Sequence, residues 1–149
     1  VWKQGIDVHV VNVGSYGWRS EVLQRRILEH EEHRKRLHWL QNANDAELHY
    51  LYSSAHALVF ASLAEGFGLP IIEAANDGLP VIASDIPIFR EVGGENISHF
   101  RALDSSDLAR KLLEAVTKER QPKKIEVPDW SQSTQQLLDM IRTQSYQLK

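Results

Sequence analysis

Short apolar runs alternate with helical stretches along almost the whole chain, and this alternation limits the fold more than any other feature. The expected strands cover residues 6–13, 37–40, 57–61, 79–84 and 97–101. The expected helices cover residues 18–32, 44–52, 69–76, 88–92, 105–119 and 130–146. Strands that alternate with helices in this way favour an α/β fold with a parallel, doubly wound sheet.

Local signals define the ends of several of these elements. Asn44 precedes a helical stretch and is followed three residues later by Glu47, which is the pattern of a capping box. Pro70 suits the first turn of a helix, and Asp77-Gly78 suits its end. The run 57–61 is almost entirely apolar, which predicts a strand covered on both faces, as in parallel sheets.

Composition excludes several classes of protein. The 149 residues suit one domain, and 42% hydrophobic with 25% charged residues is ordinary usage for a globular chain. A net charge of −3 argues against nucleic acid as a partner. The chain has no cysteine, so it has no disulfide, thiolate metal site or cysteine nucleophile, and it fits a reducing compartment. No apolar run approaches the roughly 18 residues of a membrane span.

The loop 62–68 is the strongest candidate for a functional site, because it joins an expected strand directly to an expected helix. Gly66 and Gly68 allow the backbone to approach a ligand closely, and the helix that follows offers unpaired N–H groups to a phosphate. Glu73, one helical turn further on, is suited to accept hydrogen bonds from a ribose diol. Glu65 is suited to accept from sugar hydroxyls, or to stabilise positive charge at an anomeric carbon.

The run Glu-Gly-Phe-Gly-Leu-Pro-Ile-Ile-Glu-Ala, from Glu65 to Ala74, resembles the EX7E signature of family 4 glycosyltransferases. Further stretches resemble the same family in the same order: 6–14, 44–60, 78–84, 88–94 and 129–131. The chain as a whole therefore resembles the C-terminal, donor-binding domain of a retaining glycosyltransferase of GT-B architecture.

This resemblance implies a role for each residue of the motif. Glu65 is expected to be catalytic and to face the donor sugar, and Glu73 is expected to bind the nucleotide ribose. Gly14 is expected to lie near the nucleotide. The residues expected to bind the donor sugar and its diphosphate are Gly66, Phe67, Gly68 and Leu69. The family uses a nucleoside diphosphate sugar as substrate, with no metal and no other cofactor.

The resemblance also gives expectations about substrates and location. The stretches 85–91 and 14–18 resemble mannosyltransferases of bacterial surface-polysaccharide assembly, which favours GDP-mannose as donor. The acceptor is expected to be a saccharide or a lipid-linked saccharide, bound through an N-terminal domain. The expected place is the cytoplasm, with peripheral association of the full-length protein at the inner face of the membrane.

We expect residues 1–149 to be a single sugar-nucleotide-binding domain and a fragment of a two-domain chain, because the sequence starts at Val1 and its one methionine is Met140. The Arg/Lys pair with which the family clamps the diphosphate has no counterpart in this sequence, and the first strand of the sheet is expected to be lacking. We therefore expect no transfer activity from this chain alone. A sheet without a central strand should be less stable, or should associate to cover its edges.

Other interpretations stay open at this point. The chain could be a non-catalytic nucleotide-sugar-binding module, or an epimerase acting on free sugar nucleotides. Glu73 could only complement a helix dipole, and Phe67 could plug the core. His30 and His33 are three residues apart, whereas a helical zinc pair of the zincin type needs a spacing of four, so a solvated helix end is favoured there.

Overall fold

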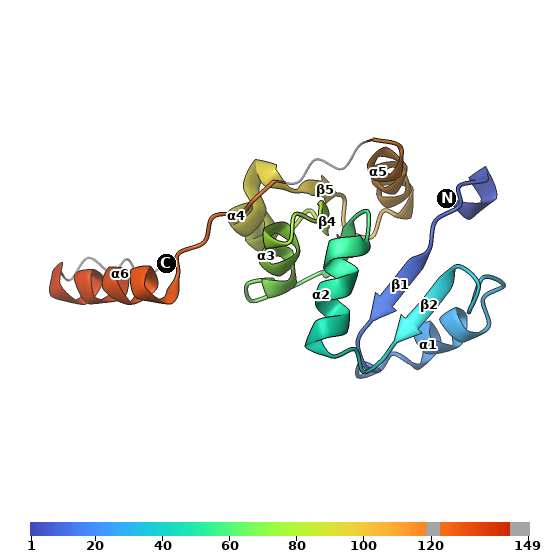
Figure 1. Cartoon of the computed structure of the whole chain (residues 1–149), viewed down its shortest axis with the longest axis horizontal. Helices are drawn as coiled ribbons and strands as arrows, with labels where there is room; N and C mark the ends of the chain where they lie inside the picture. Colours follow the sequence, from blue (N-terminus) through green and yellow to red (C-terminus); the bar gives the residue numbers. More distant parts are fainter. Residues whose placement is uncertain (119–122, 144–149) are drawn as a thin grey trace.

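The computed structural model describes residues 1–118 and 123–143. Its strands are β1 (Val10–Val13), β2 (Leu37–Leu40), β3 (Leu58–Phe60), β4 (Val81–Ser84) and β5 (Ser98–Phe100). Its α-helices are α1 (Glu21–Leu28), α2 (Asp45–Ser54), α3 (Leu69–Asn76), α4 (Pro87–Gly93), α5 (Ser105–Thr117) and α6 (Trp130–Thr143). Two short 3-10 turns, η1 (Trp2–Gln4) and η2 (Gly94–Asn96), complete the described elements, which alternate as expected along the chain (Figure 1).

All described strand pairs are parallel, but the strands form two sheets rather than one. β1 pairs with β2 from Val10 opposite Leu37 to Val13 opposite Leu40. β4 lies between β3 and β5 in the second sheet. The expected α/β class with parallel strands is confirmed. One continuous sheet is not found in the described part of the chain, because no strand there joins β1 to β3.

Several elements are shorter than the sequence pattern predicts. β1 starts at Val10 rather than at residue 6, because its partner strand starts at Leu37 and the N–H of Val10 donates to the carbonyl of Arg36 at 2.7 Å. α1 starts at Glu21 rather than at residue 18, because Arg19 has a left-handed backbone with φ of 57°. The expected helix ends at 119 and at 144–146 lie outside the described residues.

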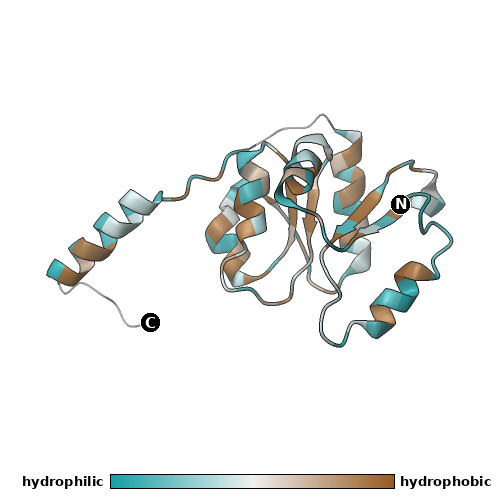
Figure 2. Ribbon diagram, turned by 60° about the horizontal axis from the view of Figure 1, so that its bottom comes forward, coloured by the Kyte–Doolittle hydropathy of each residue, from teal (hydrophilic) through white to brown (hydrophobic). Residues whose placement is uncertain are grey.

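The main buried cluster gathers residues from α2, α3, β4 and α4. All four residues of β4 are buried, and the side chains of Ile71 and Phe89 have no exposed surface. Figure 2 shows hydrophobic residues, in brown, along the central strands, with helices around them. The capping box expected at Asn44 is confirmed, since its side chain accepts from the N–H of Glu47 while the Glu47 carboxylate accepts from the N–H of Asn44. The core therefore supports the end of the molecule that holds the loop between β3 and α3.

β1 and β3, which belong to different sheets, are less buried than β4. All four residues of β1 are exposed, and Val59 of β3 is 37% exposed. The expectation that 57–61 is covered on both faces is therefore wrong at Val59. The reason is that β3 is an edge strand, which pairs only with β4 among the described residues.

We expect this chain to self-associate as its concentration rises, because β1 and β3 present apolar side chains on open strand edges. Val11→Lys places a charge on β1 and should shift the association toward monomer, whereas Val22→Lys on exposed α1 should not. Sedimentation velocity over a range of concentrations measures this. A parent chain that stays monomeric at all concentrations and melts at high temperature would contradict the expectation.

α6 lies apart from the main body of the molecule in Figure 1. Its apolar side chains, among them Leu137 and Ile141, are largely exposed. Within residues 1–118 and 123–143, the helices are too short or too polar to cross a membrane.

Candidate functional site

The loop between β3 and α3 leaves the sheet at the carboxyl ends of two paired strands. Phe60, the last residue of β3, lies opposite Ala83, and β4 ends one residue later at Ser84. The loop 61–68 and the turn at Asp85 therefore start from the same edge of the sheet. Ligands of parallel α/β sheets bind at this edge, so the motif found in the sequence lies where a ligand is expected.

Gly68 makes the turn from this loop into α3. Its backbone is left-handed, with φ of 84°, and it occupies the N-cap position of the helix. A β-carbon at this position would come within 2.8 Å of Cε1 of Phe89, the fully buried side chain of α4. Both the backbone conformation and the lack of space therefore require glycine here.

The start of α3 keeps backbone donors available. No side chain in the described part of the chain caps this helix, and Pro70 in its first turn has no N–H. The first backbone bond at this end runs from the N–H of Ile71 to the carbonyl of Gly68, at 2.9 Å. The free amides at this helix end, together with its dipole, can receive a phosphate or a sugar hydroxyl.

Glu65 lies in the exposed part of the loop and has a local partner. The hydroxyl of Ser62 donates to Oε1 of Glu65 at 2.7 Å, which restrains the carboxylate while Oε2 remains an acceptor. Phe67 is 47% exposed, so the alternative that it plugs the core is not supported. Leu69 is also exposed.

Glu73 lies on α3 and has a partner on another helix. The hydroxyl of Tyr52, on α2, donates to Oε2 of Glu73 at 3.3 Å. Burial of the phenol, the charge of Glu73 and their hydrogen bond raise the pKa of Tyr52 to about 12, so this hydroxyl stays protonated and donates. Glu73 also lines a shallow pocket of about 350 Å³ between the two helices, so a dipole effect alone does not describe its surroundings.

Gly14 lies at the carboxyl end of β1, in the other sheet. Its N–H donates to the carbonyl of Leu40 at 2.9 Å, and its carbonyl accepts from Nε1 of Trp39 at 2.7 Å. The hydroxyl of Ser15 donates to the carbonyl of Gln41 at 3.1 Å. These bonds hold the loop after β1 against the end of β2.

Arg90 is the cation nearest in sequence to the turn after β4, and it is engaged locally. Its Nε and Nη2 donate to the two carboxylate oxygens of Asp85 at 2.5 and 2.7 Å. This bidentate pair lowers the pKa of Asp85 and raises that of Arg90. Arg90 must leave Asp85, or share its charge with it, before it can bind an anionic ligand.

Comparison with known proteins identifies the family of this chain. Residues 1–127 match the family described as Glycosyl transferases group 1. The chain belongs to this family. It is 43% identical over 114 residues to the serotype-specific mannosyltransferase WbdA of Escherichia coli, a match that covers 76% of this chain and 14% of WbdA. Over 54 residues it is 54% identical to the O-antigen chain mannosyltransferase RfbU of Salmonella typhimurium, covering 36% of this chain and 15% of RfbU.

The fold of this glycosyl transferase domain also matches a solved structure. The crystal structure of the pneumococcal O-GlcNAc transferase GtfA, determined in complex with UDP and GlcNAc, superposes with a TM-score of 0.56 at 26% identity. The match covers 76% of this chain and 22% of GtfA. The family and fold expected from the Glu65–Ala74 motif are thus confirmed, while the chain spans only a small part of the relatives it matches.

The glycosyl transferase domain places the expected site residues of the motif in two neighbouring groups, whereas Gly14 follows β1 in the other sheet. Glu65 to Leu69 lie in the loop and the helix start, whereas Glu73 turns toward α2 and bonds Tyr52. Local signals in the sequence do not indicate that Tyr52 and Phe89 support the motif. Tyr52 follows Leu48 by four residues, a spacing that indicated an inward helix face but not a partner on α3.

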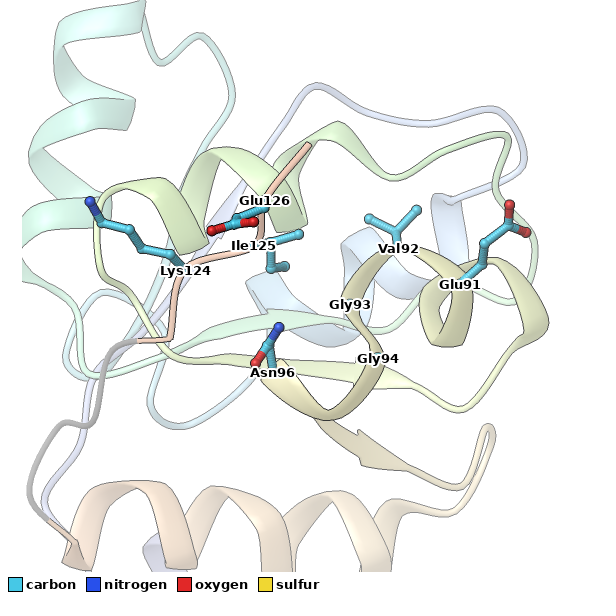
Figure 3. Close-up of a pocket in the computed structure, with 8 residues that line it drawn as sticks. All are labelled: Glu91, Val92, Gly93, Gly94, Asn96, Lys124, Ile125 and Glu126. Carbon is cyan, nitrogen blue, oxygen red and sulfur yellow. The ribbon is translucent and has the colours of Figure 1, made fainter. Parts of the chain in front are cut away.

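A second pocket lies at the other edge of the sheet, where η2 leads into β5. Figure 3 shows Gly94 and Asn96 in its wall, with Glu91 at one end and Lys124 at the other. Glu91 thus lines this pocket. Within 1–118 and 123–143, no three His, Asp or Glu side chains form a group that could hold a metal ion, so the pair His30 and His33 gains no further ligand there.

Proposed function

We propose that the protein is a retaining glycosyltransferase that transfers mannose from GDP-mannose to a saccharide acceptor in the synthesis of a surface polysaccharide. Three of its relatives, WbdA, O-antigen chain mannosyltransferase B and RfbU, are named as mannosyltransferases, which supports mannose as the sugar. In this proposal the described domain binds the donor. The acceptor, a saccharide or lipid-linked saccharide, binds to a further domain, and the protein acts at the cytoplasmic side of the membrane.

The residues of the loop and of α3 take distinct roles in this proposal. Glu65 faces the donor sugar, where its carboxylate stabilises positive charge that develops at the anomeric carbon. The amides from Gly66 to Leu69 bind sugar hydroxyls and the diphosphate, and the dipole of α3 offsets the charge of the leaving group. Glu73 accepts hydrogen bonds from the ribose, and Gly14 lies near the nucleotide. Transfer requires no metal.

One observation supports this function best. Gly68, in a left-handed conformation, directs an exposed loop into a helix start that no described side chain caps, at the carboxyl edge of a parallel sheet. Such an edge with free amides suits the diphosphate of a sugar nucleotide. Beside it, Glu65 suits the donor sugar and Glu73 suits the ribose of the same ligand.

A non-catalytic nucleotide-sugar-binding module is the second candidate. Binding requires the amides and Glu73, but transfer requires positive charge at the diphosphate as well. Arg90 is paired with Asp85, which favours the module for this chain by itself. A transfer assay with GDP-mannose and saccharide acceptors, carried out on the full-length protein with its acceptor-binding domain, separates the candidates, because only the enzyme forms product.

Replacing Glu73 tests the donor-binding proposal. We expect the parent chain to bind one nucleotide among GDP, UDP and ADP, and Glu73→Gln to weaken that binding by about tenfold or more. The reason is that a hydrogen bond to a charged group contributes about 1.5–3 kcal/mol, and 1.4 kcal/mol is tenfold in affinity. Isothermal titration calorimetry measures both values.

Glu31→Gln is the matched control, because Glu31 is exposed and lies outside the loop and α3. It should leave the nucleotide affinity unchanged. Equal affinity of the parent chain and Glu73→Gln would refute the assignment of Glu73 to the ribose. Preference for UDP or ADP over GDP would refute GDP-mannose as the donor while leaving the site in place.

A further inference from the structure

Tyr52 connects the buried core to the exposed carboxylate of Glu73. Its side chain is only 8% exposed and belongs to the main buried cluster, together with Ile71 and Ala75 of α3. Its hydroxyl points out of this cluster to Oε2 of Glu73, at 3.3 Å. The ring is held by close packing, so the hydroxyl has a defined place from which to restrain a side chain on the neighbouring helix.

A second contact holds the same two helices together. Nδ1 of His49 on α2 lies 3.0 Å from Oδ2 of Asp77, at the end of α3. His49 lies one turn before Tyr52 on α2, and Asp77 lies one turn after Glu73 at the end of α3. The two contacts are therefore one helical turn apart. Two contacts a turn apart limit both sliding and rotation of α2 against α3, and so keep the Tyr52 hydroxyl within reach of Glu73.

The hydrogen bond leaves Glu73 able to accept from a ligand. A carboxylate offers about four acceptor sites, and the Tyr52 hydroxyl takes one of them. Glu73 itself is exposed, so the remaining sites face solvent or the pocket between the helices. A free glutamate side chain loses rotamer entropy when it is ordered, and a restraint present before binding reduces that loss.

We propose that Tyr52 is a positioning residue for the nucleotide: its hydroxyl holds the Glu73 carboxylate in the orientation in which that carboxylate accepts hydrogen bonds from the ribose hydroxyls. This inference rests on the proposed role of Glu73 in donor binding. Tyr52 acts through Glu73 and does not touch the ligand. The alternative is that Tyr52 only fills the core, and its hydroxyl has no effect on the ribose.

Tyr52→Phe separates the positioning role from the core-filling role, because it keeps the packed ring and removes only the hydroxyl. The probes are the nucleoside diphosphate that binds best among GDP, UDP and ADP, and the 2′,3′-dideoxy form of the same nucleotide. We expect Tyr52→Phe to weaken the ribonucleotide by about three- to tenfold, the effect of one hydrogen bond, and to leave the dideoxy form unchanged. The matched control is Tyr50→Phe, on the same helix but 68% exposed, which should change neither affinity.

The calorimetric titrations separate a positioning role of Tyr52 from a core-filling role, and they also test the proposed role of Glu73. Equal weakening of both nucleotides by Tyr52→Phe, or no weakening of either, overturns the positioning role. If Glu73→Gln lowers the preference for the ribonucleotide while Tyr52→Phe does not, only the inference about Tyr52 fails. If Glu73→Gln keeps that preference, or if the parent chain binds none of the three nucleotides, the proposed role of Glu73 fails as well. In the double variant the two losses should not add, because both act on one contact.

Discussion

Phe89→Ala is expected to lower the free energy of unfolding by about 3–5 kcal/mol. Phe89 has no exposed surface, and its ring centroid lies 5.3 Å from that of Phe60 on β3. It also fills the space beside Gly68. Removing the ring leaves a cavity under the β3–α3 turn, and the surrounding helices can collapse into it only in part. A domain of this size has about 5–15 kcal/mol of stability, so this loss is a large part of the total.

Urea unfolding followed by circular dichroism measures the change. Phe67→Ala is the comparison, because this phenylalanine is half-exposed and should lose much less. If Phe89→Ala does not fold, Phe89→Leu should show a smaller loss of the same kind. Equal effects at Phe67 and Phe89 would contradict the packing described for the turn.

Gly68→Ala is expected to cost about 2–5 kcal/mol of stability and to abolish nucleotide binding. Alanine in the left-handed conformation costs about 1–2 kcal/mol. Its β-carbon would also come within 2.8 Å of Cε1 of Phe89, so the ring or the turn must move, which adds the cost of an overpacked core. Movement of the turn displaces the amides that are proposed to bind the diphosphate.

Gly66→Ala is the matched control two residues earlier. A β-carbon on Gly66 meets no atom within 4 Å, so this variant should keep nearly all of its stability. Thermal unfolding and nucleotide titration of both variants measure the difference. Equal stability of the two variants would show that Gly68 is not constrained as described. The double variant Gly68→Ala with Phe89→Leu should lose less stability than the sum of the two single variants, because the smaller side chain relieves the contact.

Local signals in the sequence predicted much of the candidate site. The helix 69–76 has the predicted bounds, with Pro70 in its first turn, and the capping box at Asn44 forms as its spacing indicated. These features depend on residues within a few positions of each other, so their physical cause is visible in the sequence. The same holds for the run from Glu65 to Glu73, since the loop and the first turns of one helix position both carboxylates.

The length of β1 and the division of the sheet did not follow from local signals. Residues 6–9 are as rich in β-branched and apolar side chains as many strands, but a strand ends where its partner ends, and β2 begins only at Leu37. Val59 was expected to be buried because its neighbours in sequence are apolar. Its burial depends instead on which strands and helices lie beside β3, and the described part of the chain leaves that edge open.

The sequence by itself determined the α/β class, the family, and the loop and helix that hold Glu65 and Glu73, because these arise from short-range periodicity, turn residues and one compact motif. Only the tertiary structure decided that Tyr52 bonds Glu73 and that Phe89 closes the space beside Gly68. Each of these contacts joins residues 21 positions apart on different helices or turns. Such pairs depend on how the helices pack on the sheet, and packing is a property of the whole chain rather than of any segment.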